Sequence, residues 1–159
     1  DRAAQGGDDG AFSLPRVHIE DAPLDMSFSG LKTAMLNLIH KAQQKGETLP
    51  VADLAASFSA AVSEELVPRT MAAARQTGYR KVAVVGGVAA NSRIRRDLEA
   101  ACQQAGCTLY LPPLKLCGDN GSMIGSQGYY EYLAGTRGGE DLNGYANRDI
   151  SLPYRREGV

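Results

Sequence analysis

The sequence predicts an α/β fold built around a strand, a helix and a second strand that form one crossover of a largely parallel sheet. An apolar, β-branched run at residues 82–85 stops at Gly86 and Gly87, as expected of a strand that enters a glycine turn. Apolar residues at helical spacing follow over residues 91–104. A second apolar run, residues 107–111, predicts the returning strand. Because such sheets bind ligands at the carboxyl ends of their strands, the glycine turn is a candidate site.

Upstream of this crossover, the sequence predicts a loop-rich start and then a helix. Residues 1–4 fit the end of a helix, and residues 6–10 carry the glycines and aspartates typical of turns. Residues 25–30 alternate polar and apolar side chains, which indicates a short strand. The helix that follows has one apolar face, formed by Leu31, Ala34, Met35, Leu38 and Ala42.

A long second helix is predicted from Pro50, which suits a first turn, to Gly78, which suits a C-terminal stop. Its apolar residues recur at helical spacing: Val51, Leu54, Ala55, Phe58, Val62 and Leu66. Pro68 interrupts the pattern, and in a continuous helix it would cost about 3 kcal/mol. We therefore expect a kink at Pro68 or two separate helices.

Composition places the chain among ordinary globular proteins. Its 159 residues are 43% hydrophobic and 22% charged, with a net charge of −1, which argues against a surface coated with positive charge for nucleic acid. Cys102, Cys107 and Cys117 lack the paired spacing of a metal site, so we expect reduced thiols. No apolar run reaches the 18 or so residues of a membrane helix, and we expect a cytoplasmic protein. Because the chain begins at Asp1 and not at Met, we expect further sequence upstream.

The glycine turn carries the first candidate for ligand binding. Gly86 and Gly87 would let a ligand approach the main chain, and the next helix would offer unpaired N–H groups to an anion or a nucleotide. Asn91 stands where that helix begins. Its spacing is equally compatible with a ligand contact and with a plain helix cap.

Other polar residues support weaker hypotheses. Arg93, Arg95 and Arg96 form either a solvated helix face, which we favour, or a phosphate contact. Ser27, Ser29 and Lys32 would line a site or, as we favour, lie on the surface.

Asp119 is the second candidate. It precedes a further apolar helix that runs through Ile124, Tyr129 and Leu133, and a lone Asp in that place is usually an N-cap. After Gly135 the sequence predicts an irregular, loop-rich tail.

Three ordered runs resemble a known family. They are SFSGLKTA at residues 27–34, VVGGVAANSRIR at residues 84–95 and CGDNGSMIG at residues 117–125. In this order they resemble the carboxyl-terminal half of the bacterial tRNA threonylcarbamoyladenosine transferases, formerly called O-sialoglycoprotein endopeptidases or glycoproteases. The resemblance extends over residues 1–153.

The fold implied by this resemblance is that of the actin, sugar-kinase and Hsp70 ATPases, in which two ribonuclease-H-like lobes enclose a nucleotide cleft. Residues 1–30 would be the edge of the second lobe and residues 31–80 a helical insertion. Residues 81–135 would form the nucleotide- and metal-binding core, and residues 136–159 an irregular tail.

The resemblance also implies roles for single residues. Gly86 and Gly87 would approach a bound adenylate by their main chain, Asn91 would hydrogen-bond it, and Asp1 would contact the nucleotide sugar. Asp119 would bind one iron(II) or magnesium ion, together with two histidines of the other lobe. His18 and His40 match no such histidine pair and are not assigned to the metal.

The reaction implied is transfer of a threonylcarbamoyl group from threonylcarbamoyl-AMP to the amine of the adenosine beside the anticodon. The implied partners are this nucleotide or an ATP- or AMP-like one, tRNA, and the other proteins of the bacterial modification complex. With half of the cleft missing, we expect these residues alone to be inactive and to bind nucleotide weakly.

Three other functions remain open at this point. One alternative is a non-catalytic nucleotide-binding or dimerisation lobe of the same complex. Another is a phosphotransferase similar to the sugar kinases, although no catalytic carboxylate for a sugar is recognisable in the sequence. A protease is the weakest hypothesis, because the chain has no His-Glu-x-x-His or nucleophile motif.

Overall fold

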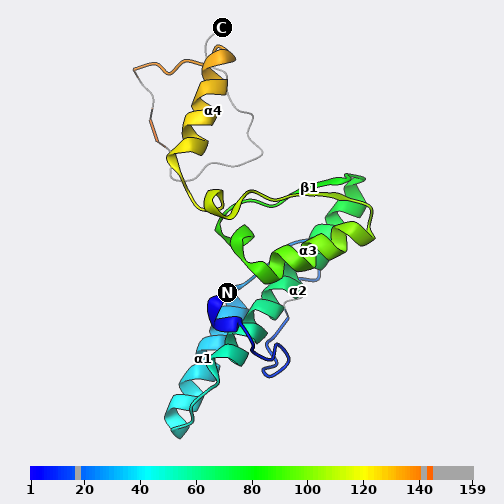
Figure 1. The fold of residues 1–159 in the computed structure, drawn as a ribbon, viewed down its shortest axis with the longest axis vertical. Coiled ribbons are helices and arrows are strands. Elements are labelled where there is room, and N and C mark those ends of the chain that lie inside the picture. The colour runs from blue at the N-terminus through cyan, green and yellow to red at the C-terminus, as the bar shows by residue number, and fades with distance from the viewer. Residues whose placement is uncertain (17–18, 141–142, 145–159) are drawn as a thin grey trace. The chain divides into compact units, whose positions relative to one another are not determined.

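The computed structural model describes residues 1–16, 19–140 and 143–144. It divides into two compact units, residues 1–118 and residues 119–159, each described here by itself. The first unit contains η1 (Arg2–Ala4), α1 (Ser29–Lys45), α2 (Val51–Thr77), β1 (Lys81–Ala83), η2 (Gly87–Ala90), α3 (Ser92–Gln104), β2 (Thr108–Tyr110) and η3 (Leu114–Leu116) (Figure 1). The second contains α4 (Gly121–Leu133).

The predicted crossover is present. β1 and β2 pair in parallel, with Lys81, Val82 and Ala83 opposite Thr108, Leu109 and Tyr110. α3 joins them and packs against α2. Both strands are shorter than predicted, although the N–H of Val84 still donates to the carbonyl of Tyr110 at 3.0 Å. The mixed helix and strand architecture is therefore confirmed, as a sheet of two short strands within the described residues.

A small core holds this unit together. Met71 of α2, Val82 of β1 and Cys102 of α3 are all at most 9% exposed and form one cluster. Ile94 and Leu98 are also buried on α3, each 3% exposed, so the apolar face predicted for this helix is the face it buries. Gly106, at φ 65°, follows the end of α3 in the left-handed region, which glycine enters without strain.

α2 is one helix from Val51 to Thr77 with Pro68 inside it, so the alternative of two separate helices is wrong. The proline lies on the exposed side, and buried residues flank it, with Glu65 6% and Met71 4% exposed. Burial on both sides of the proline keeps both halves within one helix, and tertiary packing outweighs the local penalty.

The strand predicted at residues 25–30 is also wrong. Ser29 and Gly30 form the first turn of α1, and Phe28 precedes it in a helical conformation. Among the residues that the structure describes, no strand pairs with this segment, and the N–H of Asp25 closes a turn onto the carbonyl of Ala22 at 3.0 Å. Ser29 and Lys32 lie exposed and Ser27 is half-buried, which agrees with surface positions.

In the second unit, α4 begins at an asparagine cap. The Asn120 Oδ1 accepts from the N–H of Met123 at 3.0 Å. The helix ends before Gly135, which has φ 86°. Residues 135–140 are irregular, as predicted, and most of the predicted tail lies outside the described residues. Of the helices described, none has the length and apolarity to cross a bilayer.

Candidate functional site

The loop between β1 and α3 depends on one glycine for its shape but not on the other. Gly86 has φ 85° and ψ 176°, a conformation that only glycine adopts easily. Gly87 has no positive φ, and a Cβ built on it would meet no atom within 4 Å. Neither backbone strain nor packing within the chain therefore requires glycine at position 87.

Asn91 caps α3. Its Oδ1 accepts from the N–H of Ile94 at 3.0 Å, which confirms the cap interpretation. The amide of an asparagine has two ends, and this bond uses only the acceptor. A ligand contact through the Nδ2 donor is compatible with the cap, so the two interpretations of Asn91 do not exclude each other.

The structure brings Asp1 to the same turn, although 90 residues separate it from Asn91 in sequence. The Ser92 hydroxyl donates to Asp1 Oδ1 at 2.7 Å, and the Ser92 N–H donates to Oδ2 at 3.2 Å. A carboxylate is favourable at this end of a helix, where the dipole is positive. All four residues predicted to bind nucleotide, Gly86, Gly87, Asn91 and Asp1, thus lie at or beside one turn.

These bonds use most of the donors at the start of α3. A helix leaves its first four N–H groups without helical partners. Here the N–H groups of Asn91, Ser92 and Ile94 donate to the Val88 carbonyl, to Asp1 and to the Asn91 side chain. The turn is therefore poorly suited to a phosphate and better suited to a neutral part of a nucleotide.

A hollow of about 350 Å³ opens beside this turn. Asp1, Ser92 and Arg96 contribute to its wall, together with Gly6 and Gly7. Its position gives the Asp1 carboxylate access to a small molecule as well as to Ser92.

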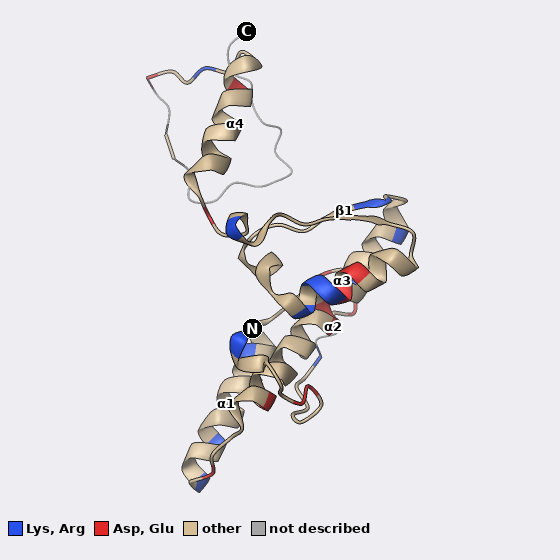
Figure 2. Cartoon of the chain, viewed as in Figure 1, with Lys and Arg blue, Asp and Glu red and all other residues tan. Residues whose placement is uncertain are grey.

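Arginines of α3 bind acceptors of the protein itself. Arg93 pairs with Asp9 and with Asp97, and Figure 2 shows basic and acidic residues next to one another on this helix. The hydrogen bond with Asp9, followed by that with Asp97, raises the pKa of the Arg93 guanidinium. Arg96 is exposed, as the solvated-face hypothesis requires, whereas Arg93 and Arg95 are half-buried and do not fit it.

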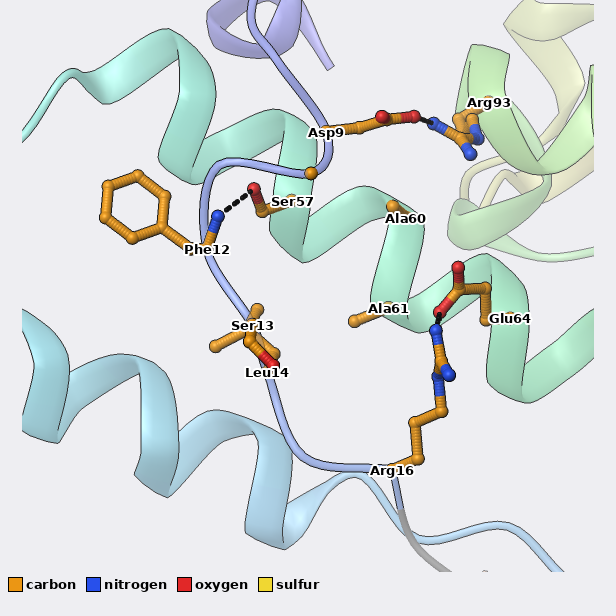
Figure 3. Close-up of a pocket in the computed structure, with 11 residues that line it drawn as sticks. Asp9, Phe12, Ser13, Leu14, Arg16, Ser57, Ala60, Ala61, Glu64 and Arg93 are labelled. Atoms are coloured by element: carbon orange, nitrogen blue, oxygen red, sulfur yellow. Dashed lines mark hydrogen bonds and ion pairs between the residues drawn. The ribbon is translucent and has the colours of Figure 1, made fainter.

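A second hollow, of about 490 Å³, lies between the segment around Phe12 and α2 (Figure 3). Its charged side chains pair with each other: Arg16 with Glu64 at 2.5 Å, and Arg93 with Asp9. The N–H of Phe12 donates to the Ser57 hydroxyl at 3.1 Å. These bonds attach the N-terminal segment to α2 and α3. The polar residues that line the hollow therefore have a structural role.

The cysteines are free thiols in the part of the chain that the structure describes. Burial, with a smaller contribution from Cys107, raises the pKa of the Cys102 thiol. Cys117 is 3% exposed, with its Sγ 3.6 Å from the Pro113 carbonyl oxygen. A buried thiol of this kind fits packing and not nucleophilic chemistry.

Asp119 is exposed and is not the cap of α4, because Asn120 holds that position. The N-cap interpretation of Asp119 is therefore wrong. Among residues 1–16, 19–140 and 143–144, no three His, Cys, Asp or Glu side chains form a group that could hold a metal ion. A divalent ion takes about six oxygen ligands, so one carboxylate does not complete a metal site. Asp119 belongs to the second unit, and its role as a metal ligand stays a prediction.

Comparison with known proteins gives a consistent result. A sequence model of the family described as "tRNA N6-adenosine threonylcarbamoyltransferase" matches residues 1–126. A protein of that name from Latilactobacillus sakei subsp. sakei (strain 23K) is 46% identical over 99% of this chain and 45% of its own length. Another from Moorella thermoacetica is 47% identical over 84% of this chain and 39% of its own. A third, from Clostridium botulinum (strain 657), is 43% identical over 92% and 43%. The chain thus spans less than half the length of these curated relatives.

Proposed function

Because the chain belongs to the tRNA N6-adenosine threonylcarbamoyltransferase family, we propose that it supplies the adenosine-binding part of such a transferase. The proposed reaction moves a threonylcarbamoyl group from threonylcarbamoyl-AMP to the exocyclic amine of the adenosine beside the anticodon. Because tRNA is the acceptor, the activity belongs in the cytoplasm, with the other proteins of the modification complex as partners.

The observation that carries the proposal is the turn at the start of α3. It combines an open main chain at Gly87, an asparagine whose Nδ2 is not needed for the cap, and the carboxylate of Asp1. An adenine offers ring nitrogens that accept from an amide N–H, and a ribose offers hydroxyls that donate to a carboxylate. The occupied helix donors favour the nucleoside over the phosphates at this turn.

For the fold, we propose that β1, α3 and β2 belong to a ribonuclease-H-like lobe of the actin, sugar-kinase and Hsp70 type. Residues 31–80 would be its helical insertion, and α1 and α2 account for most of that range. Residues 1–30 would be the lobe's edge, residues 81–135 its core and residues 136–159 its tail.

In the proposed mechanism these residues bind and orient, and they do not react. The acceptor amine attacks the carbamoyl carbon, the bond to the AMP phosphate breaks, and the amine loses a proton. Holding the adenosine of threonylcarbamoyl-AMP in a fixed place orients its acyl phosphate for attack by the tRNA amine, which lowers the entropic part of the barrier. Gly86, Gly87 and Asn91 would hold the base, and Asp1 the sugar.

The proposed metal ion, iron(II) or magnesium, does not fit the donors described in this chain. Asp119 would be one ligand, and the others would have to come from residues outside this sequence. The proposed function therefore rests on the nucleoside-binding residues.

The test replaces Asn91 by aspartate in the complete protein that the gene encodes. Asn91→Asp keeps an oxygen to accept from the Ile94 N–H and removes the Nδ2 donor. We expect thermal stability to change little, AMP affinity to fall about tenfold or more, and transfer from threonylcarbamoyl-AMP to tRNA to fall with it. Calorimetry and a tRNA modification assay measure the two effects.

Asn37→Asp is the matched control, because it adds the same charge on the exposed surface of α1. It should leave both measurements unchanged. AMP binding by the unsubstituted protein without any transfer would instead identify a non-catalytic nucleotide-binding lobe. Absence of AMP binding would refute the nucleoside site itself.

A further inference from the structure

Arg95 connects the glycine turn to the loop that follows β2. Its Nε donates to the carbonyl of Ala89 at 2.5 Å. One terminal nitrogen donates to the carbonyl of Pro112 at 2.6 Å and lies 3.2 Å from the Sγ of Cys117. A single guanidinium thus bonds acceptors on both loops that emerge at the carboxyl ends of the paired strands.

Ala89 anchors the glycine turn by burial and by hydrogen bonds. Its side chain is fully buried, at 0% exposure, whereas neighbouring Val88 is 58% exposed. The Ala89 N–H donates back to the Gly86 carbonyl at 3.0 Å, so its position also sets that of Gly86. Arg95 supplies the bond to its carbonyl, and the loop therefore depends on this side chain for its placement.

The second loop also accepts a hydrogen bond from the Arg95 side chain. Pro112 and Pro113 have no N–H and cannot pair with the neighbouring chain through their nitrogens. Cys117 is buried at 3% exposure close to the Pro113 carbonyl, and Arg95 donates to the Pro112 carbonyl and approaches this thiol. The planar fork of an arginine suits this task, because its nitrogens point to separate acceptors in a fixed geometry.

We propose that Arg95 is a positioning residue that holds the glycine turn ready for adenosine without touching the ligand. The inference rests on the proposed function and adds to it a residue that acts through Ala89. With Arg95 in place, the turn is already ordered before the nucleotide binds, so binding does not have to supply the ordering. The same bonds use Nε and one terminal nitrogen of Arg95, so three of its five N–H groups already bind acceptors of the protein.

The experiment compares Arg95→Met and Arg95→Lys with the unsubstituted complete protein, using AMP as the probe. Methionine keeps much of the apolar stem and loses every donor, and we expect AMP affinity to fall about tenfold. Lysine keeps the charge, but its single nitrogen has to replace the two nitrogens with which Arg95 reaches its acceptors. We therefore expect a smaller loss of AMP affinity than with methionine. Calorimetry is done at a temperature at which circular dichroism shows each variant folded.

Arg80→Met is the matched control. Arg80 also donates to a main-chain carbonyl, that of Ala105 at 3.0 Å, but it precedes β1 and lies at the other end of the strands. We expect it to lower thermal stability by less than Arg95→Met, because Arg80 is exposed and its loss removes one such bond, and to leave AMP affinity unchanged.

Amide hydrogen exchange separates positioning from a general loss of structure. In the Arg95 variants without AMP, exchange should accelerate at the Ala89 and Asn91 N–H groups, which close the turn. Saturating AMP should slow it again, and the Val84 N–H, bonded between the strands, should exchange as before. Acceleration at all three groups would indicate a structural role only and would overturn the proposal.

The outcomes separate the two proposals. If the unsubstituted protein fails to bind AMP, the proposed function fails. If it binds AMP and the Arg95 variants bind equally well, the site stands and the positioning role of Arg95 is refuted. If Arg95→Met does not fold, Arg95→Lys decides between these results.

Discussion

Single residues in this chain show why local sequence patterns reveal some contacts and not others. The turn at Gly86 and the cap at Asn91 were predictable, because the strand, the turn and the cap lie within about ten residues of each other. Ser92 carried no such signal, since its partner Asp1 is remote in sequence. Arg95 was assigned with its neighbours to a basic face, because sequence shows the charge but not the carbonyls that it meets.

Gly87 allows a clean test of ligand approach at the residue scale. A methyl group on residue 87 meets no atom within 4 Å, and the backbone there needs no glycine. Gly87→Ala should therefore leave the melting temperature nearly unchanged, while the methyl group occupies space that a ligand needs. We expect AMP affinity to fall about tenfold, measured by calorimetry.

Gly10→Ala is its control, since the added Cβ makes only an ordinary 3.5 Å contact with Asp8 Oδ1. Normal AMP affinity in Gly87→Ala would show that no ligand approaches the main chain at this point.

Asp97 provides a prediction for pH. Burial acts to raise the pKa of its carboxyl, but hydrogen bonds from Ser63 and Arg93 outweigh burial, and the pKa lies below its ordinary value of 3.8. The unfolded chain therefore binds this proton more readily than the folded protein. The ionised Asp97 contributes its full stabilisation above the ordinary pKa, and this contribution is lost as the pH falls through the pKa of Asp97 in the folded protein. Asp97→Asn should cost about 1–3 kcal/mol at pH 7.

Urea unfolding at pH 7 and pH 3 measures this difference, which should shrink at the lower pH. Glu99→Gln, exposed on the same helix, serves as the control. An equal cost of Asp97→Asn at both pH values would contradict the assignment.

At the scale of elements, the helices α1 to α4 were predictable from apolar spacing, and the errors arose where tertiary context decides. The strand expected at residues 25–30 needs a partner strand, and its residues entered the start of α1 instead. The break expected at Pro68 follows from a local penalty, which burial on α2 overcomes. Periodicity reports which face is apolar, but not whether neighbours will hold an unfavourable residue in a helix.

Pro68→Ala tests how much the proline inside α2 costs in stability. Alanine restores an N–H for the helical hydrogen bonds and favours the helix, whereas it also gives the unfolded chain more freedom. We expect the free energy of unfolding to rise by about 1–2 kcal/mol as the net of these effects. Thermal and urea unfolding measure it. A loss of stability would mean that α2 packs through a shape that the proline itself imposes.

At the scale of the whole molecule, the described sheet is small for an α/β domain. Two short strands bury little surface, and several strands or packed helices are normally needed. The chain also spans less than half the length of its curated relatives. Sequence patterns identified the family, whereas they could not place Asp119 relative to the turn, because that depends on packing between units.

This size leads to a prediction about activity. The 159 residues alone should transfer no threonylcarbamoyl group and should bind AMP weakly, because under the proposed function residues from elsewhere would complete the cleft. A tRNA modification assay with threonylcarbamoyl-AMP compares this chain with the complete gene product. Robust transfer by the 159 residues would show that the cleft is already complete.

The occupied N–H groups at the start of α3 also bear on inhibitor chemistry. Since Asp1 and Asn91 already satisfy two of those groups, a compound aimed at this turn gains little from an anionic tail. Uncharged nucleoside analogues, which pass into cells more easily than nucleotides, would be the natural starting point for blocking it.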